Sequence, residues 1–300
     1  MSSRNHGPLL DALRGVRWPA RRAVGAALPG THRSRQRGTS GEFTEYRLYR
    51  QGDDPRQLDW KLLARSDRAF VRLTDDRALL ATWLVVDASA SMAFPMREPD
   101  DDSRATKWTV ASDLAVGLGA VAHASSDPIG LIASGVGGPV RMSARSRRGT
   151  VGELSRTLDR ITPGGDTALA PLMTTIPVMA RVVLISDLLG DNDDLIRVAA
   201  QRTVAGGIVE CVHVVAAEEL ALPAGAHLAR DPDAHWQRAM DRRGHTEYHE
   251  RFDAFRAEAA RRWRASGAGY VEARTDQSVA RLVRQIVSGL GRTAKDTVRK

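Results

Sequence analysis

The regular alternation of short apolar runs with longer segments of helical periodicity constrains this chain more than any other feature. The runs at 81–86 (ATWLVV), 181–185 (RVVLI) and 208–216 are rich in β-branched residues and short. Such continuous apolar runs are typical of strands that are buried on both faces of a sheet. Because helical segments separate them, we predict an α/β fold, a doubly wound and mostly parallel sheet with helices on both faces.

The same patterns place the remaining elements along the chain. We expect further strands at 128–133, 140–142 and 270–273, and helices at 107–122, 151–160, 168–179, 193–205, 246–265 and 278–290, of which the helix at 168–179 is interrupted by Pro171 and Pro177. Residues 218–245 are rich in Ala, Pro, Asp and His, and are predicted to form an irregular excursion. The main domain is therefore predicted over 77–292, followed by a tail at 293–300.

The net charge of +8 is concentrated near the amino end. Residues 1–40 hold eight arginines and one acidic residue, which leaves 36 of the 44 basic and 35 of the 36 acidic side chains to the remaining residues. We expect residues 1–36 to be a basic, mostly disordered tail, although Leu9, Leu10 and Leu13 have the spacing of a short partner-binding helix. The arginines of residues 1–37 could also bind nucleic acid or an anionic membrane, but a solvated tail is favoured.

Composition excludes several classes of protein. With 42% hydrophobic and 27% charged residues, the chain is neither collagen-like nor fully disordered. Its one cysteine, Cys211, cannot form an internal disulfide. The longest apolar run, at 78–86, is far shorter than the roughly 18 residues of a membrane helix, and the amino end lacks the apolar core of a secretory signal. We expect a cytoplasmic protein.

Three oxygen-rich clusters occur at loops that the predicted fold brings to one edge of the sheet. The clusters are Asp87-Ala-Ser89-Ala-Ser91 after the run at 81–86, Gly164-Gly165-Asp166-Thr167 before a helix, and Ser186-Asp187 after the run at 181–185. In a doubly wound sheet, ligands bind beyond the carboxyl ends of the strands, where the strand order reverses. Carboxylates and hydroxyls are the hard oxygen ligands that Mg²⁺ takes, so the clusters predict a site for a divalent ion.

A less specific interpretation treats each cluster separately. Ser89 and Ser91 would cap the segment that follows them, and Asp187 would cap a helix. This interpretation does not explain why three such clusters occur at corresponding positions, and we favour the metal site.

The arrangement resembles the von Willebrand factor A domain, a Rossmann-type fold, and its metal-ion-dependent adhesion site. The resemblance implies one Mg²⁺ or Mn²⁺ ion that is held by Asp87, Ser89, Ser91, Thr167 and Asp187. The loop departs from the family pattern, which places threonine directly after the glycines, so Asp166 could take the place of Thr167. Asp166 and Ser186 are therefore secondary candidates. The implied mechanism is coordination of a partner's Asp or Glu at an open ligand position, without catalysis.

The segment upstream of these clusters carries a second resemblance. Residues 42–60 read EFTEYRLYRQGDDPRQLDW, followed by Ala-Arg at 64–65. This is similar to the signature of a bacterial family catalogued as domain of unknown function fifty-eight, in which it precedes an A-like domain with the same metal motif. The resemblance implies a family-specific segment at 37–76 that packs on the main domain. It also implies a partner, a ring-forming AAA+ ATPase of the MoxR type, in a chaperone-like or complex-maturation role.

Side-chain chemistry leaves two roles open for this segment. Its arginines can pair with its aspartates, its glycine and aspartates favour a turn, and its aromatic residues can bury apolar area. The favoured role is a structural strap; the alternative is a partner-docking surface, with Asp53 or Asp54 able to occupy the open metal position in an autoinhibited state. The residues concerned are Arg47, Tyr49, Gly52, Asp53, Asp54, Arg56, Asp59, Trp60 and Arg65.

An enzymatic alternative is a magnesium-dependent hydrolase with Asp87 as nucleophile. Phosphoryl-transferring aspartate enzymes of the haloacid dehalogenase type would want a second aspartate two residues on, where this chain has Ser89. The sequence contains neither a P-loop motif nor a G-x-S-x-G elbow. We therefore expect a non-enzymatic interaction module.

Overall fold

The computed structural model describes residues 4–18, 43–49, 58–66, 68–74, 80–95, 105–165, 168–190, 192–222, 228–230, 237–239 and 242–289. The chain divides into two compact units. The main unit comprises Met1–Gly25 and Leu80–Lys300, and the smaller unit comprises Ala26–Leu79.

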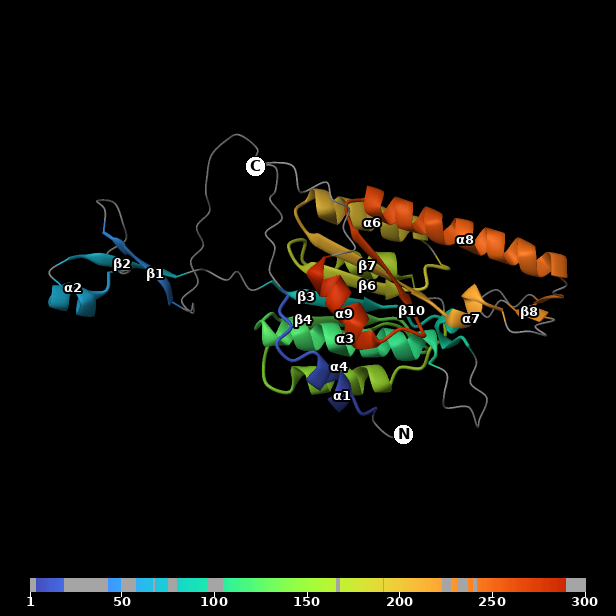
Figure 1. The fold of residues 1–300 in the computed structure, drawn as a ribbon, viewed down its shortest axis with the longest axis horizontal. Coiled ribbons are helices and arrows are strands. Elements are labelled where there is room, and N and C mark those ends of the chain that lie inside the picture. Colours follow the sequence, from blue (N-terminus) through green and yellow to red (C-terminus); the bar gives the residue numbers. More distant parts are fainter. Residues whose placement is uncertain are drawn as a thin grey trace. The chain divides into compact units, whose positions relative to one another are not determined.

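A six-stranded sheet forms the centre of the main unit (Figure 1). Its order is β10-β7-β6-β3-β4-β5, and every neighbouring pair is parallel except β4 and β5. Counted along the sheet's own strands, this is the order 3-2-1-4-5-6 of doubly wound domains, which confirms the predicted fold class. The bounds are β3 Thr82–Val86, β4 Ile129–Ala133, β5 Val140–Arg145, β6 Arg181–Ser186, β7 Ile208–Val215 and β10 Gly269–Arg274.

Helices cover both faces of this sheet (Figure 1). One face carries α3 (Lys107–Ala124), α4 (Thr150–Asp159) and α9 (Val279–Ser288). The other carries α5 (Leu169–Thr174), α6 (Asn192–Val204) and α8 (Arg242–Ala265). No helix in the described part of the chain combines the length and the apolar character that a bilayer crossing requires.

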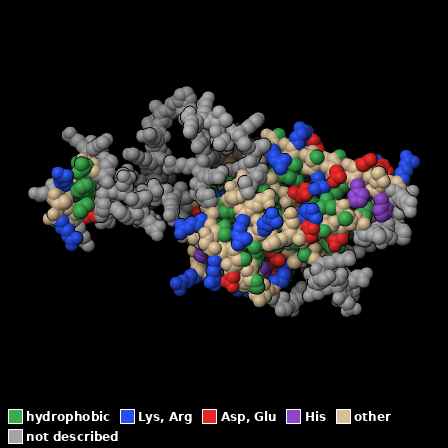
Figure 2. Space-filling view, in the orientation of Figure 1, with side chains coloured by type: hydrophobic (Ala, Val, Ile, Leu, Met, Phe, Trp, Pro, Cys, Tyr) green, Lys and Arg blue, Asp and Glu red, His purple; other side chains and the backbone are tan. Residues whose placement is uncertain are grey.

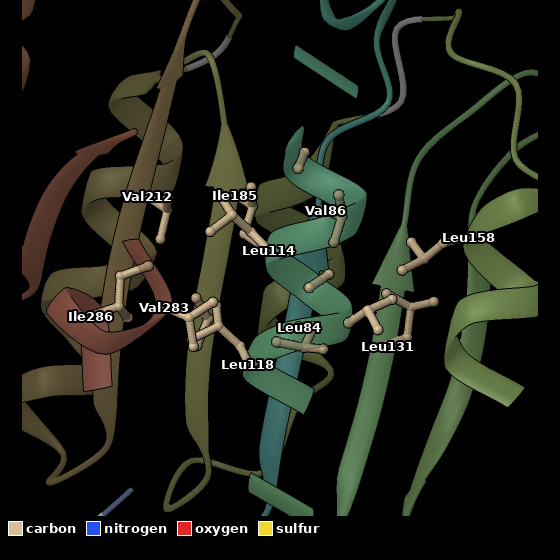
Figure 3. Close-up of a cluster of buried hydrophobic side chains, with 14 of the residues drawn as sticks. Leu84, Val86, Leu114, Leu118, Leu131, Leu158, Ile185, Val212, Val283 and Ile286 are labelled. Carbon is tan, nitrogen blue, oxygen red and sulfur yellow. The ribbon is translucent and has the colours of Figure 1, made fainter. Parts of the chain in front are cut away.

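Strand β3 shows why the buried runs are continuously apolar. Successive side chains of a strand point to opposite faces, so Leu84 and Val86 enter one core while Trp83 and Val85 enter the other. Figure 3 shows Leu84 and Val86 together with Leu114 and Leu118 of α3 and with Val283 and Ile286 of α9. At Gly119 of α3, a Cβ would lie 2.6 Å from Leu154, so only glycine permits this approach of α3 to α4.

The amino-terminal residues 4–18 differ from the mostly disordered tail that we expected over 1–36. Helix α1 (Gly7–Ala12) packs on α3 and α9, and Leu13 and Trp18 are buried. The guanidinium of Arg181 lies 4.2 Å from the Trp18 ring centroid. The helical spacing of the leucines was therefore informative, but the partner of this helix belongs to the same chain.

Two further predictions need correction. The helix expected at 168–179 is the shorter α5, which ends before Pro177 as the predicted interruption requires, but Pro171 lies within its first turn, where no backbone hydrogen bond is lost, and does not interrupt it. The excursion expected at 218–245 contains α7 (Ala217–Leu220) and a hairpin of β8 (Leu228–Arg230) and β9 (Gln237–Ala239), and α8 begins within its range.

The smaller unit contains an antiparallel pair, β1 (Phe43–Leu48) and β2 (Phe70–Thr74), with α2 (Trp60–Ser66) between them in sequence. Asp59 is buried and its Oδ1 accepts the Leu62 amide hydrogen at 3.1 Å, which caps the first turn of α2. The next residue, Trp60, is 64% exposed within this unit, and the burial expected for its side chain stays a prediction. The predicted packing of this segment on the main domain stays a prediction.

Candidate functional site

The candidate site lies where the strand order of the main sheet reverses. The chain runs from β3 outward through β4 to β5, then returns to β6 on the other side of β3. Ligand crevices form at such switch points, beyond the carboxyl ends of the two diverging strands. Asp87 follows β3 and Asp187 follows β6, and the Asp87 amide donates to the Ile185 carbonyl at 2.9 Å. The structure thus brings the first and third predicted clusters together.

Three donors fix the Asp87 carboxylate. Its Oδ2 accepts from the Ser186 hydroxyl at 2.7 Å, and its Oδ1 accepts from the Ser89 amide at 2.9 Å. Ser134, which follows β4, donates more weakly to Oδ1 at 3.5 Å while its Oγ accepts the Ala88 amide hydrogen at 2.8 Å. Three neighbouring strand ends, those of β3, β4 and β6, therefore meet at one carboxylate.

The two serines of the first cluster are adjacent to each other. The Ser89 and Ser91 hydroxyls share a hydrogen bond, with their oxygens 3.0 Å apart, and Ser89 precedes a short 3₁₀ segment, Ala90–Ala93, without capping it through its side chain. Asp187 accepts the Leu189 amide hydrogen at 3.2 Å and lies five residues before α6 begins, so this contact is no helix cap. The capping interpretation of these clusters is therefore not supported at Ser89 or at Asp187.

A buried lysine, which the sequence patterns did not predict as a site residue, completes the site. Lys107, the first residue of α3, places its Nζ 2.7 Å from Asp187 Oδ2 and 2.9 Å from Glu219 Oε1. The Lys107 and Asp187 side chains are only 1% and 3% exposed. Glu219 lies in α7, just after β7, and its Oε2 accepts the Ala216 amide hydrogen at 2.7 Å. A fourth strand end thus contributes to the cluster.

The charges in this cluster explain the direction of each pKa shift. Burial, and then the nearby Asp187, raise the pKa of the Asp87 carboxyl above its ordinary value, although hydrogen bonds from Ser186 and Ser89 oppose the shift. For Lys107, burial lowers the pKa, but the carboxylates of Asp187 and Glu219 outweigh it and raise the pKa. Lys107 is therefore a permanent cation at physiological pH.

The glycine loop of the second cluster lies beside the first cluster. The Gly164 amide donates to the Ala88 carbonyl at 2.7 Å, and Gly164 and Gly165 have φ values of 151° and 78°, which favour glycine. The two candidate ligands that follow, Asp166 and Thr167, lie outside the described residues. Which of them serves as ligand stays a prediction.

The described side chains fit a small divalent ion. Adjacent ligands of an octahedral Mg²⁺ at about 2.1 Å lie about 3.0 Å from each other, and the Ser89 and Ser91 hydroxyl oxygens have this separation. The carboxylates of Asp87 and Asp187 add negative oxygen ligands at the same sheet edge. Among the described residues, no group of three or more His, Cys, Asp or Glu side chains offers an alternative site. The set is of the hard, all-oxygen type that suits Mg²⁺ or Mn²⁺.

The upstream signature is only partly described. Gly52, Asp53, Asp54 and Arg56 lie outside the described residues, so their proposed roles stay predictions. Arg47 is in β1, and the Tyr49 amide donates to the Ala69 carbonyl at 2.8 Å. Asp59 caps α2, while Arg65 is exposed in its last turn.

On the face of the main unit that Figure 2 shows, surface charge does not single out a nucleic-acid interface. On the face that Figure 2 shows, basic and acidic side chains are interspersed over the described residues, without a large patch of either sign. In the amino-terminal segment, Arg4 is paired with Asp113 and Asp159 of the main unit, and Arg14 with Asp11. These arginines are already engaged within the chain.

Comparisons with known proteins add the following similarities. The uncharacterized proteins Rv1480 of Mycobacterium tuberculosis and Mb1516 of Mycobacterium bovis are each 28% identical over 298 residues, which covers 93% of this chain and 89% of each relative. The solved structure of BatB from Bacteroides thetaiotaomicron is 17% identical, with a TM-score of 0.46, over 70% of this chain and 97% of that one. The SpRpn10 VWA domain is 12% identical, with a TM-score of 0.39, over 68% of this chain and 93% of that one.

The family comparison gives a match over residues 45–262 with the family described as protein of unknown function DUF58. The match begins within the upstream signature and extends through all three oxygen-rich clusters of the main unit. Because it covers well over half of the sequence, this chain belongs to the DUF58 family.

Proposed function

We propose that this protein is a protein-interaction module that depends on a divalent metal ion. One Mg²⁺ or Mn²⁺ would be held by Asp87, Ser89, Ser91 and Asp187, with Asp166 or Thr167 as a further ligand. The observation that carries the proposal is the pair of Ser89 and Ser91 hydroxyls, 3.0 Å apart, beside Asp87 at the switch point of the sheet. When bound, the ion would supply a positive coordination position for an Asp or Glu of the partner.

The chain's own residues favour binding over catalysis. The two Asp87 carboxylate oxygens already accept hydrogen bonds from Ser186 and from the Ser89 amide, which hold the carboxylate in place. A hydrolase that used Asp87 as nucleophile would need a general acid or base beside it, and the residue two positions on is Ser89. Because Lys107 is paired with Asp187 and the hydroxyl ligands are neutral, part of the ion's charge would stay uncompensated, which favours an anionic partner group.

Metal binding is tested directly on the full chain with Mn²⁺, whose unpaired electrons report binding by electron paramagnetic resonance. We expect the wild-type chain to bind about one Mn²⁺, and the Ser89→Ala, Ser91→Ala double variant to lose it. Ser112→Ala is the matched control, because Ser112 is a buried serine of α3 whose hydroxyl has no hydrogen-bond partner among the described residues. Detectable Mn²⁺ binding that is equal in the wild type and the double variant would contradict the proposed ligand set.

The proposed partner is a MoxR-type ring ATPase, on the strength of the family resemblance. Pull-down of the purified ATPase with the full chain should succeed in Mg²⁺, fail in EDTA and recover when Mg²⁺ is restored. The serine double variant should fail in all three conditions, and Ser112→Ala should behave as wild type. Binding that persists in EDTA would exclude metal coordination as its basis. Magnesium-dependent phosphatase turnover that is lost in Asp87→Ala would instead favour the hydrolase.

A further inference from the structure

We propose that Lys107 is a built-in counter-cation of the metal site, which weakens the protein's own affinity for a divalent ion and makes firm retention of the ion depend on a partner's carboxylate. The inference rests on the proposed metal site and concerns how that site is regulated. It assigns a positioning and charge-setting role to Lys107 and Glu219, two residues outside the ligand set.

The geometry places the ammonium of Lys107 between two carboxylates from different elements. Its Nζ lies 2.7 Å from Asp187 Oδ2 and 2.9 Å from Glu219 Oε1, and both pairs are almost fully buried. Two of the three ammonium hydrogens are thereby directed at carboxylates. The same Asp187 carboxylate is a proposed ligand, so an ion bound there would share it with a fixed positive charge a few ångströms away.

This fixed charge opposes the charge of the ion. A unit charge acting on a divalent ion across several ångströms changes its affinity by about tenfold even at the dielectric constant of water, and by more in a buried site. Two carboxylates alone would bind a divalent ion more tightly than two carboxylates with an internal ammonium. An incoming Asp or Glu restores the missing negative charge, so ion and partner favour each other's binding.

Glu219 is a second charge beside the proposed metal site, and its sign is opposite to that of Lys107. Its Oε1 accepts a hydrogen bond from Lys107, and its Oε2 accepts the Ala216 amide hydrogen at the start of α7, which keeps the carboxylate in place. In the wild type the cluster carries a net formal charge of −2, counted over Asp87, Asp187, Glu219 and Lys107. The count becomes −3 in Lys107→Met, −1 in Glu219→Gln and −2 in the double variant. The more negative the net charge of the cluster, the more tightly the variant should bind the ion.

A purely structural role of Lys107 predicts a different order of ion affinities among the variants. If Lys107 only supports the fold around Asp187, its loss should disorder the ligands and weaken ion binding. Arg181→Met is a matched control, because Arg181 is an equally buried cation that faces Asp127 at 3.5 Å. It lies at the opposite end of the same strand, β6, about 16 Å from the site at the usual rise per residue.

The test is a titration of Mn²⁺ alone into the full chain, followed by electron paramagnetic resonance or calorimetry. Relative to wild type, we expect Lys107→Met to bind Mn²⁺ at least tenfold more tightly and Glu219→Gln at least tenfold more weakly. The double variant and Arg181→Met should remain within about threefold of wild type. Binding by Lys107→Met where wild-type binding is too weak to detect would also support the inference.

Three outcomes would overturn it. Unchanged or weaker binding by folded Lys107→Met would assign Lys107 a structural role, while leaving the proposed function intact as long as the wild type binds Mn²⁺. If Lys107→Met does not fold, Glu219→Gln decides alone, and unchanged or tighter binding would reject the inference. If neither wild type nor any folded variant binds Mn²⁺, the proposed function fails as well.

Discussion

The Ser186 hydroxyl donates a 2.7 Å hydrogen bond to Oδ2 of Asp87, although the two residues are 99 positions apart in the sequence. Both side chains are buried, and Ser186 Oγ also accepts the Leu188 amide hydrogen at 3.0 Å. One hydroxyl therefore joins the end of β3 to the loop after β6, the two segments that carry the proposed aspartate ligands. Ser186 holds Asp87 in position from the neighbouring strand.

Removing this hydroxyl should destabilise the protein measurably. Ser186→Ala leaves a buried carboxylate oxygen and the Leu188 amide without their partner, and the loss of buried hydrogen-bond partners costs about 1–3 kcal/mol. We expect a decrease of that size in the free energy of unfolding, measured in urea at neutral pH without metal. Ser288→Ala, which removes an exposed hydroxyl in α9, should change it by less than about 0.5 kcal/mol. Equal effects of both variants would contradict the anchoring role.

Neutralising Asp87 should stabilise the metal-free protein while abolishing metal binding. Because burial raises the pKa of Asp87 above its ordinary value of 3.8, its contribution to stability is fully present below that value and is lost as pH rises through the folded-state pKa. Asp87→Asn removes this titration, so its free energy of unfolding should exceed that of wild type at neutral pH. The excess should shrink as pH falls toward 4. Urea unfolding in EDTA between about pH 4 and pH 7 measures this difference in the free energy of unfolding. If Asp87→Asn is less stable than wild type at pH 7, the prediction is wrong.

The fold could be predicted because burial on both faces leaves a direct trace in the sequence. The buried runs within β3 and β6, residues 83–86 and 182–185, are apolar at every position, and this distinguishes them from the helices between them. The amino-terminal segment was misjudged because its arginines dominate its composition. Of residues 4–18, only Leu13 and Trp18 are buried hydrophobic side chains. Two buried residues do not make a periodic pattern strong enough to predict that the segment docks on the main unit.

The site could be predicted only as far as it follows the strand ends. Asp87 and Asp187 come directly after buried strands and Ser186 ends one, whereas Lys107 opens a helix, where a lysine is ordinarily solvated. A signal was present, because Lys107 is in phase with the apolar positions 110, 114, 118 and 121 of α3, all of them buried. Glu219 follows β7 at the same sheet edge, but the residues after it read as an irregular excursion, so its partner could not be foreseen.

The buried His213 should make the protein sensitive to mild acid. Burial lowers its pKa from 6.5 to about 4, and its Nδ1 lies 2.7 Å from the Tyr270 hydroxyl. Between these two pH values the unfolded chain binds a proton that the folded protein excludes, so stability falls as pH decreases from about 6.5 to about 4, by roughly 3 kcal/mol. Urea unfolding of His213→Asn should show a slope against pH that is smaller by about one proton. An unchanged slope in His213→Asn would contradict the assignment.

The docked amino-terminal segment should contribute strongly to the stability of the main unit. Trp18 is 5% exposed and packs in the same core as α3 and α9, with the Arg181 guanidinium 4.2 Å from its ring centroid. Truncating a buried tryptophan to alanine typically costs about 3–5 kcal/mol, and we expect Trp18→Ala to lower the free energy of unfolding by that amount. Trp60→Ala, at a tryptophan that is 64% exposed, should lower it by less than about 1 kcal/mol. Denaturant unfolding followed by circular dichroism measures both. A disordered tail over residues 1–36 would instead leave Trp18→Ala as stable as wild type.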